Sequence, residues 1–443
     1  MSSPDRNPLS AWRWIPTLYF SQGIPCVVVM TLSVVMYKNL KGSNTDIALY
    51  TSWLYLPWVI KPLWSPLVDM FQTRRLWIVS LQLVVGAALA LVALTVPSPN
   101  FFRYTLAIFW LLAFSSATHD IAADGFYLLA LPQHQQAAFV GVRSTFYRLA
   151  MIAGQGGLVY LAGSLQAATG DIRRAWSLVF WVVAVFFVLV SLYHLIVLPR
   201  PASDHAAARG PQPVTGYFSV FAAFFRKKGV STILGFLLLY RFAEAQLLKL
   251  VTPFLLGARE IGGLGLTTQQ VGVIYGTPRH PLAHRRGPGG RLCDLSPGAQ
   301  TTAVADDHRH ARAQCRLHPP GARAAGKPLH HRRRAGGRAA RLRLRLHCLH
   351  GLHDDGRGRR AQDSYYAIRT GFMALGMMLP GMATGWIRDH LGYVSFFMWV
   401  CVATIPSFVA TALIKVDPAF GKIAGANPRE APSERAPVQA DGP

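Results

Sequence analysis

Charged residues are scarce in this 443-residue sequence: they make up 15% of it, against about a quarter of an ordinary soluble domain. Half of the residues are hydrophobic, and they are gathered in long runs. A helix needs about 20 predominantly apolar residues to cross the hydrocarbon core of a bilayer. Seven or more runs reach that length, which excludes a soluble multidomain protein. The composition therefore predicts an all-α, multi-pass membrane protein.

The sequence also lacks the patterns of common enzymes. Outside residues 278–362 it contains no nucleophile motif, no phosphate-binding loop and no paired metal-ligand spacing. Only Cys26 and Cys401 remain there, both in apolar runs, so no disulfide framework is indicated. We expect no enzymatic activity, no cofactor and no metal site. An intramembrane enzyme would have to rest on His119 and the aspartates beside it.

The apolar runs predict the helices. They lie at about 14–37, 47–69, 76–96, 104–131, 137–165, 175–198, 230–257, 365–387 and 393–415, and a further run starts near 267. The first run exceeds the apolar core of a signal peptide and lacks a small-residue cleavage site, so we expect it to be retained. Residues 278–362 would hold the rest of the run that starts near 267 and two further helices at roughly 28 residues per helix plus loop. That restores twelve helices in two sets of six.

This pattern divides the chain into six parts. They are a six-helix bundle at 1–198, a cytoplasmic linker at 199–229, the start of a second bundle at 230–277, an aberrant segment at 278–362, two last helices at 363–415 and a disordered tail at 416–443. With the N-terminus inside, inner loops of the first half hold nine Lys and Arg residues and outer loops hold five. This excess favours cytoplasmic N- and C-termini.

Residues 278–362 differ in composition from both flanks. They contain no Phe, Trp, Tyr, Ile, Met, Asn or Glu, but 18 Arg, 1 Lys and 5 Asp, and so carry +14 of the net charge of +25. They also hold 10 of the 15 His and 3 of the 5 Cys. Arg, Gly, Ala, Pro and His are what GC-rich codons for membrane helices give when they are read out of phase. We interpret the segment as a frameshift, which erases most of helix eight and the next two helices.

Two other interpretations of this segment stay open. The spacing of His347, His350 and His353, with Cys348 beside them, could indicate a metal site. A basic disordered arm could bind RNA or anionic lipid. The isoelectric point near 10.5 invites the same idea, but without the segment the net charge is only +11, as membrane proteins with basic inner loops commonly have. We therefore expect no nucleic-acid partner.

An acidic pair lies inside the fourth apolar run, in the sequence SSATHDIAADGFY. Asp120 and Asp124 are four residues apart and share one face of a helix, with His119 about 100° round from them. Two neighbouring carboxylates repel, which raises the proton affinity of one of them. A proton-coupled carrier needs such a group. The alternative is a static salt bridge to Arg143 or Arg148 in the next run, and both could hold; Arg148 is also a candidate for contact with substrate.

Other charges mark two further places. In the run YRFAEAQLLK, Glu244 could be a second titrating group paired with Arg241, and Lys249 could meet an anionic substrate; an interface charge network is the alternative. Near the end of the second run, Asp69 precedes a short loop that carries two adjacent arginines. An acid at a helix end that faces a basic loop suits a gating contact. The gating residues are Asp69, Arg74 and Arg75.

At these residues the chain resembles the major facilitator superfamily and, within it, the AmpG-like muropeptide permease family. The matching stretches are LYFSQGIP (18–25), LPWVIKPLWSPLVD (56–69), ATHDIAADGFY (117–127), YRLAMIAGQGG (147–157) and residues 366–393. The resemblance implies two six-helix bundles around a central cavity, alternating access, and proton-driven uptake across the bacterial inner membrane. Asp120 and Asp124 match the family's acidic pair, while His119 stands where the family is expected to have Gln.

The predicted function is therefore a secondary active transporter. We expect proton-coupled uptake of peptidoglycan-derived muropeptides or a related anionic solute, with protons and the lipid bilayer as the other partners. Because three helices are missing, we expect this form of the chain to be inactive. The alternative is a non-transporting membrane scaffold or sensor whose basic insert binds a partner.

Overall fold

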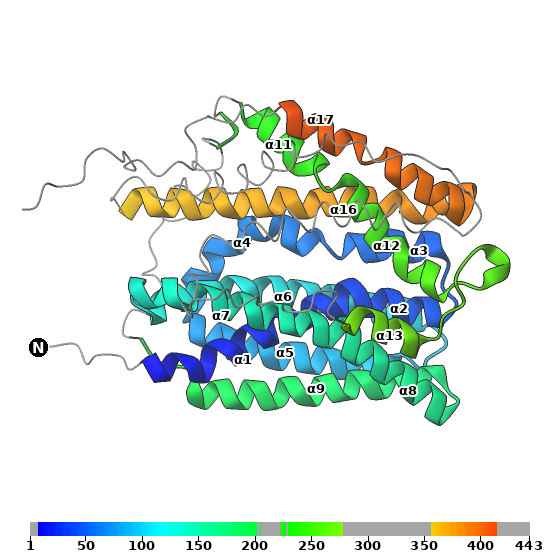
Figure 1. Ribbon diagram of the computed structural model, residues 1–443. Helices are drawn as coiled ribbons and strands as arrows, with labels where there is room; N and C mark the ends of the chain where they lie inside the picture. Colours follow the sequence, from blue (N-terminus) through cyan, green and yellow to red (C-terminus); the bar gives the residue numbers. More distant parts are fainter. Residues whose placement is uncertain are drawn as a thin grey trace, which may run out of the picture.

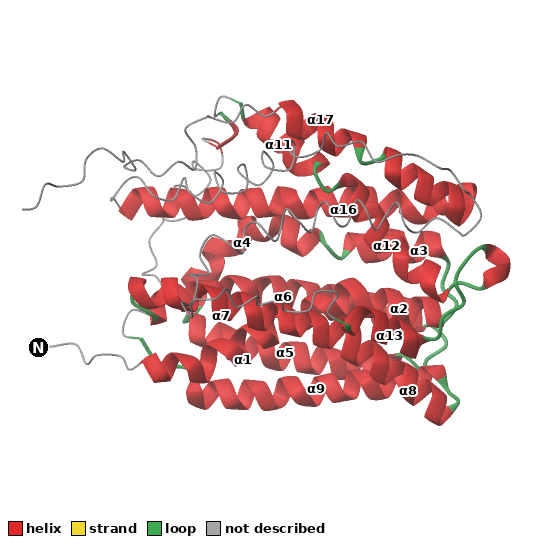
Figure 2. Ribbon diagram, in the orientation of Figure 1, coloured by secondary structure: helices red, strands yellow, loops and turns green. Residues whose placement is uncertain are grey.

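The computed structural model describes residues 8–201, 204, 222, 224–226, 229–277 and 356–413. Helices joined by short loops account for all the secondary structure in these ranges (Figure 2). The predicted all-α class is thus confirmed. Several predicted features lie outside the described residues: the histidine spacing at 347–353, most of the aberrant segment, most of the linker, and the tail. The side chain of Asp69 also lies outside them.

The first half of the chain forms helices that follow the predicted apolar runs. They are α1 (Pro8–Val27), η1 (Val28–Leu32), α2 (Ser33–Asn39), α3 (Asn44–Trp53), α4 (Leu56–Phe71), α5 (Arg74–Thr95), α6 (Phe101–Ala130), α7 (Gln133–Ile152), η2 (Ala153–Leu158), α8 (Val159–Thr169) and α9 (Ile172–Val197). Three of the predicted runs are not one continuous α-helix. The second breaks between α3 and α4, where Pro57 enters at the first turn of α4, a position that tolerates its missing N–H. The first and fifth runs stay helical throughout, but each contains a short π-helical turn, η1 and η2 respectively.

The second half is shorter. Its helices are α11 (Val230–Leu239), α12 (Phe242–Leu256), the 3-10 turn η3 (Arg259–Ile261), α13 (Thr268–Gly276), α16 (Gly356–Val402) and α17 (Ile405–Leu413). A capping box between Thr267 and Gln270 starts α13. The long α16 is kinked at Gly392, whose φ of 73° and ψ of 171° are not helical. Glycine alone adopts such a backbone without strain, so the predicted boundary between the last two runs falls there.

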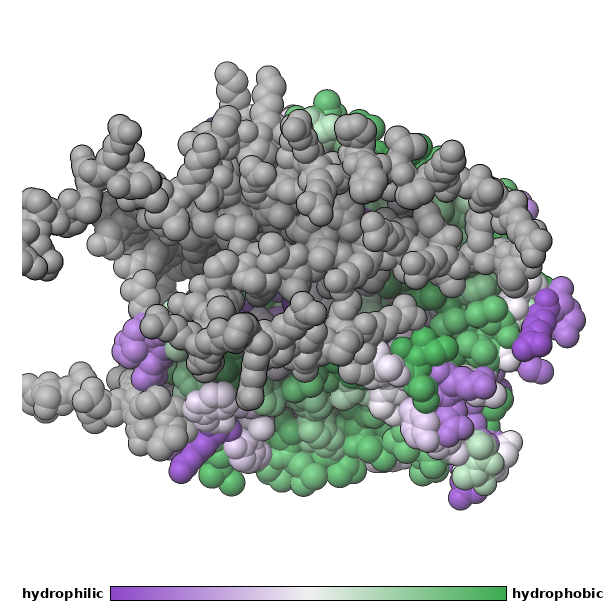
Figure 3. Space-filling model, viewed as in Figure 1, coloured by the Kyte–Doolittle hydropathy of each residue, from purple (hydrophilic) through white to green (hydrophobic). Residues whose placement is uncertain are grey.

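Within the described ranges, five helical stretches are long and apolar enough to cross a membrane. They are Ala11–Asn39, Arg74–Thr95, Phe101–Ala130, Ile172–Val197 and Ile368–Leu413. A helix satisfies all its backbone hydrogen bonds internally, which is the condition for crossing hydrocarbon. On the side of the molecule shown in Figure 3, hydrophobic residues cover the flank of the helices, and hydrophilic residues gather toward the ends.

Helix α5 packs between α6 and α9, while α1 packs on α7. Large buried side chains fill the space between them, among them Phe109, Trp176 and Phe180. From the second half, α16 lies along α3 and α4, and α13 lies along α8 and η2 (Figure 1). Segments more than 100 residues apart in sequence are therefore joined along two lines of contact.

Glycines permit the contact between α13 and the fifth run. A methyl group at Gly156 would lie 2.2 Å from the Cα of Gly276, and one at Gly272 would lie 2.3 Å from the backbone nitrogen of Tyr160. Both separations are far below van der Waals contact. At Gly163 a methyl group would lie 2.2 Å from the backbone nitrogen of Gln269. Backbones of the two halves thus touch directly, as small residues allow in membrane helices.

This contact can be tested with two adjacent glycines. Gly156→Ala should lower the stability by about 1–3 kcal/mol, because the added methyl group forces α13 away. Gly157 has no atom within 4 Å of such a methyl group. Gly157→Ala should therefore be neutral, or stabilising by up to about 1 kcal/mol. Thermal unfolding of the purified chain in detergent measures both; equal effects would contradict the packing described.

Candidate functional site

The two aspartates of α6 have different hydrogen-bond partners. Asp120 accepts a hydrogen bond from the indole nitrogen of Trp58 in α4, with Oδ2 and Nε1 3.0 Å apart. Asp124 accepts from Arg143 in α7 at 2.7 Å and from the hydroxyl of Tyr19 in α1 at 3.3 Å. The two carboxylates share a helix face, as their spacing predicted, but only Asp124 forms an ion pair.

Aromatic rings hold the arginine of that ion pair in place. The guanidinium carbon of Arg143 lies 4.6 Å from the ring centre of Tyr19 and 5.0 Å from that of Tyr127. A cation over an aromatic face is attracted by the ring quadrupole, more strongly when water is excluded. The site therefore fixes a positive charge beside Asp124 with contributions from α1, α6 and α7.

A cavity of about 280 Å³ opens beside Asp120. Its wall combines one acid, two bases, two phenols, a hydroxyl and an amide; the lining residues are Tyr19, Gln22, Asp120, Arg143, Ser144, Tyr147 and Arg148. All of them come from α1, α6 and α7. Convergent charged and aromatic groups around one cavity are typical of a ligand site. Arg148, proposed from sequence, lies here, whereas Gln22, Ser144 and the two tyrosines were not anticipated.

His119 takes part in a different network. Its side chain is 4% exposed, and its Nε2 lies 3.2 Å from the amide nitrogen of Gln82 in α5. The amide oxygen of Gln82 lies 3.0 Å from Nδ1 of His194 in α9, whose Nε2 lies 3.0 Å from the hydroxyl of Thr17. Because Gln82 can donate to His119 and accept from His194, it joins two buried imidazoles. His119 is absent from the lining of the cavity described above.

Glu244 and Lys249 lie on α12, apart from this cavity. Arg241 donates to both carboxylate oxygens of Glu244, at 2.7 and 2.5 Å, so the i, i+3 pairing considered from sequence is present. Lys249 is 5% exposed and donates to the hydroxyl of Thr51 in α3 at 3.0 Å. Its ammonium group also lies 5.1 Å from the ring centre of Tyr55. A buried ammonium ion with these neutral partners bridges the two halves of the chain.

The short loop between α4 and α5 is held by a residue that the sequence did not reveal. Asp204, after α9, accepts from the backbone nitrogens of Arg74 and Arg75 at 2.8 and 3.1 Å. A carboxylate at a helix N-terminus satisfies free N–H groups and interacts well with the helix dipole. The side chain of Arg75 donates to the carbonyl groups of Leu198, at 3.2 Å, and Leu195.

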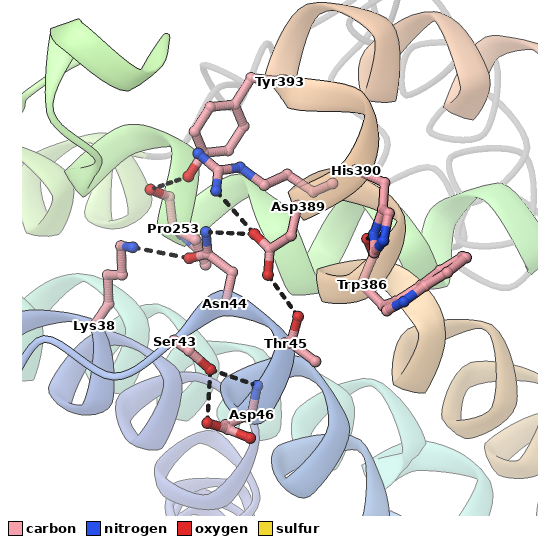
Figure 4. A network of polar contacts seen from close by, with 11 residues as sticks. Lys38, Ser43, Asn44, Thr45, Asp46, Pro253, Trp386, Asp389, His390 and Tyr393 are labelled. Atoms are coloured by element: carbon pink, nitrogen blue, oxygen red, sulfur yellow. Dashed lines mark hydrogen bonds and ion pairs between the residues drawn. The ribbon is translucent and has the colours of Figure 1, made fainter.

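Polar side chains join α16 to the first residues of α3 (Figure 4). Asp389 accepts from Thr45 at 2.5 Å, from Arg388 at 2.9 Å and from Asn44 at 3.5 Å. The guanidinium carbon of Arg388 lies 3.9 Å from the ring centre of Tyr393. These contacts close one end of the interface between the halves.

The Major Facilitator Superfamily profile matches residues 17–292, more than half of the chain. The chain belongs to the major facilitator superfamily. Two solved structures of this transporter fold are similar to it in shape. The nucleoside transporter NupG has a TM-score of 0.53 at 14% identity, over 92% of this chain and 99% of that one. A bacterial homologue of the human lysosomal transporter Spinster has a TM-score of 0.50 at 16% identity, over 93% and 82%. These likenesses show the fold alone.

Curated relatives support the AmpG-like resemblance. The Anhydromuropeptide permease of Escherichia coli (strain K12) is 29% identical over 236 residues, which are 49% of this chain and 45% of that protein. The Putative transporter AmpG 4 of Rickettsia conorii (strain ATCC VR-613 / Malish 7) is 27% identical over 271 residues, 57% of this chain and 60% of that protein. The chain thus spans about half the length of the curated relatives it matches.

The Asp389 network makes a prediction for this transporter. Thr45→Val keeps the side-chain shape but removes a charge-assisted hydrogen bond, worth about 1–3 kcal/mol. We expect faster amide hydrogen exchange, measured by mass spectrometry, in peptides from residues 38–53. The control is Thr95→Val, because Thr95 donates to Leu91 O within its own helix. Equal exchange in both variants would show that the network does not hold this end closed.

Proposed function

We propose that this transporter takes up an anionic sugar-peptide of the anhydromuropeptide class together with protons. The cavity beside Asp120 carries the proposal, because it combines a carboxyl group with two arginines and two tyrosines. Arginine is well suited to a carboxylate, since its planar fork can donate two parallel hydrogen bonds. Tyrosine offers a broad apolar face and a polar tip to the remaining part of such a ligand. The names of the curated relatives point to the same class.

Asp120 is the proposed proton site. It accepts a hydrogen bond from a neutral donor, Trp58, whereas Asp124 is held by the cation of Arg143. A guanidinium that pairs with a carboxylate stabilises the ionised form, and removing the charge would leave the cation uncompensated. Asp124 therefore serves to fix Arg143, and Asp120 is the carboxyl group that changes its charge during transport.

Proton and ligand are coupled through charge. An ionised Asp120 offsets part of the positive potential of Arg143 and Arg148, which line the same cavity. Protonation removes that negative charge, so an anionic ligand binds more tightly. By thermodynamic linkage the ligand then raises the affinity for the proton to the same extent. Such reciprocity is what symport requires.

The proposed topology has two six-helix bundles, at 1–198 and from 230 onward, joined by a linker at 199–229 with both termini in the cytoplasm of a bacterial inner membrane. We propose that residues 278–362 are a frameshifted stretch and that this form does not complete transport. Two observations support it: the family profile ends at residue 292, and the chain covers only 45% of the Escherichia coli permease. The cavity lies wholly in residues 19–148, so binding should persist.

Uptake of labelled anhydromuropeptide by a permease-deficient bacterium tests the proposal. The chain as given should bind the ligand after purification but give no accumulation in cells. A version with residues 278–362 restored from the alternative reading frame should accumulate it, and Asp120→Asn in that version should abolish the dependence on the proton gradient.

The matched control is Asp171→Asn, because Asp171 is an exposed N-cap residue of α9 outside the cavity. Accumulation by the chain as given would contradict the frameshift. Proton-driven accumulation that survives in the Asp120→Asn variant would contradict the assignment of the proton site.

A further inference from the structure

One polar atom in the wall of the cavity is left without a partner. The side chain of Gln22, in α1, is 6% exposed and lines the cavity, and its Oε1 has no hydrogen-bond partner within the described ranges. A buried acceptor that has lost its water and gained no donor costs free energy, so such atoms are rare in folded proteins. An unpaired acceptor in a ligand cavity needs a physical reason.

The neighbour of Gln22 supplies that reason. Gln22 and Asp120 line the same cavity, and the Gln22 amide interacts with the Asp120 carboxyl group. An ionised carboxylate only accepts hydrogen bonds, so the amide must present its nitrogen to Asp120. The amide oxygen then lies on the other side of the group, where it has no donor. An unpaired Oε1 is therefore the arrangement that an ionised Asp120 requires of Gln22.

Protonation reverses the requirement. A neutral carboxyl group carries one O–H donor, and Gln22 Oε1 is the free acceptor next to it. A half-turn of the amide about its last side-chain bond would place Oε1 toward Asp120. It would also turn the two N–H donors of Gln22 away from Asp120. This rotation moves only two heavy atoms, Oε1 and Nε2, and needs no change in the backbone.

We propose that Gln22 is a positioning residue that converts protonation of Asp120 into a change of the cavity wall from acceptor to donor. The inference rests on the proposed proton coupling and explains how the ligand detects the proton. With Asp120 ionised, the free carbonyl group repels a ligand carboxylate; with Asp120 protonated, the free amide group binds it. The amide flip adds a directional hydrogen bond to the effect of charge.

Other titratable groups surround Asp120 and have to be held constant in any test. They are Cys26 on α1, Lys61 on α4, His119 and Asp124 on α6, and Arg143, Tyr147 and Arg148 on α7, with Tyr19 on α1 across the cavity. Variants at Gln22 leave all of them in place. Glutamine itself does not titrate, so any pH effect of its replacement must act through a neighbour.

The test measures the dissociation constant of anhydromuropeptide for the purified full chain as a function of pH. In the wild type we expect the affinity to rise by about tenfold from alkaline to acidic pH, a typical coupling between two sites. In Gln22→Leu the rise should fall below about threefold, because only the charge effect is left. Full pH dependence in Gln22→Leu would overturn the proposal.

Asp120→Asn separates the flip from the loss of charge. An asparagine can donate its N–H to Gln22 Oε1 and so imitates the protonated acid. This variant should bind tightly at every pH, and adding Gln22→Leu should remove most of that gain. Additive effects of the two substitutions would contradict a shared hydrogen bond. The matched control is Gln246→Leu, since Gln246 is equally buried but bonds Trp399 in the other half.

A measurement without ligand keeps the two proposals apart. The carbonyl stretch of protonated Asp120, identified by its loss in Asp120→Asn, reports the hydrogen bond that its hydroxyl donates. Infrared difference spectra between alkaline and acidic pH should show this band displaced in Gln22→Leu and unchanged in Gln246→Leu. An unmoved band would overturn the inference about Gln22. A displaced band with no muropeptide binding would support it while the proposed substrate fails.

Discussion

The cost of placing a charge in apolar surroundings governs the arrangement of this transporter. Asp124 is paired with Arg143, and Arg241 donates two hydrogen bonds to Glu244, so these charges are compensated by direct neighbours. Asp120 instead accepts a hydrogen bond from the neutral Trp58, and Lys61, a cation near it among the described residues, forms no direct ion pair with it. The carboxyl group whose charge is not fully compensated, that of Asp120, is thus the one that lines the cavity. This supports the proposal that Asp120 binds the proton.

The contacts between the two halves show how this site is connected to the interface between them. At one end, Asp389 binds Thr45 and Asn44, and backbone approaches backbone where a methyl group at Gly385 would lie 2.2 Å from the carbonyl oxygen of Asn44. Trp58, which bonds Asp120, lies on α4, and α4 packs along α16. A single helix, α4, therefore separates Asp120 from the interface between the two halves. This arrangement supports the proposed coupling between proton binding and movement of the halves.

Much of the fold follows from the sequence. The apolar runs located the helices, and the four-residue spacing of Asp120 and Asp124 placed both on one face, because these signals are local. The breaks between α3 and α4 and between α11 and α12 escaped detection, since both lie inside runs that are apolar overall. His119 was grouped with the acids as their neighbour in sequence, yet the helix turns it by about 100° toward α5.

The residues that were missed share a physical cause. Asp204 lies in a polar linker, yet it caps α5 from 130 positions away. Gln82 meets His119 and His194 only after three helices, α5, α6 and α9, pack together, and Gln22 lies in a short stretch with no charge to mark it. Tertiary proximity creates these sites, and no periodicity in one sequence encodes it. The AmpG-like resemblance located the helix that carries Gln22 but not the role of its amide.

Proton uptake on ligand binding tests the central claim most directly. Calorimetric titration of the full chain with anhydromuropeptide, in buffers of different ionisation enthalpy, gives the number of protons bound with each ligand. We expect an uptake of up to one proton per ligand near the midpoint of Asp120 protonation, and none in Asp120→Asn. Ligand binding without proton uptake at any pH, or equal uptake in the variant, would contradict it.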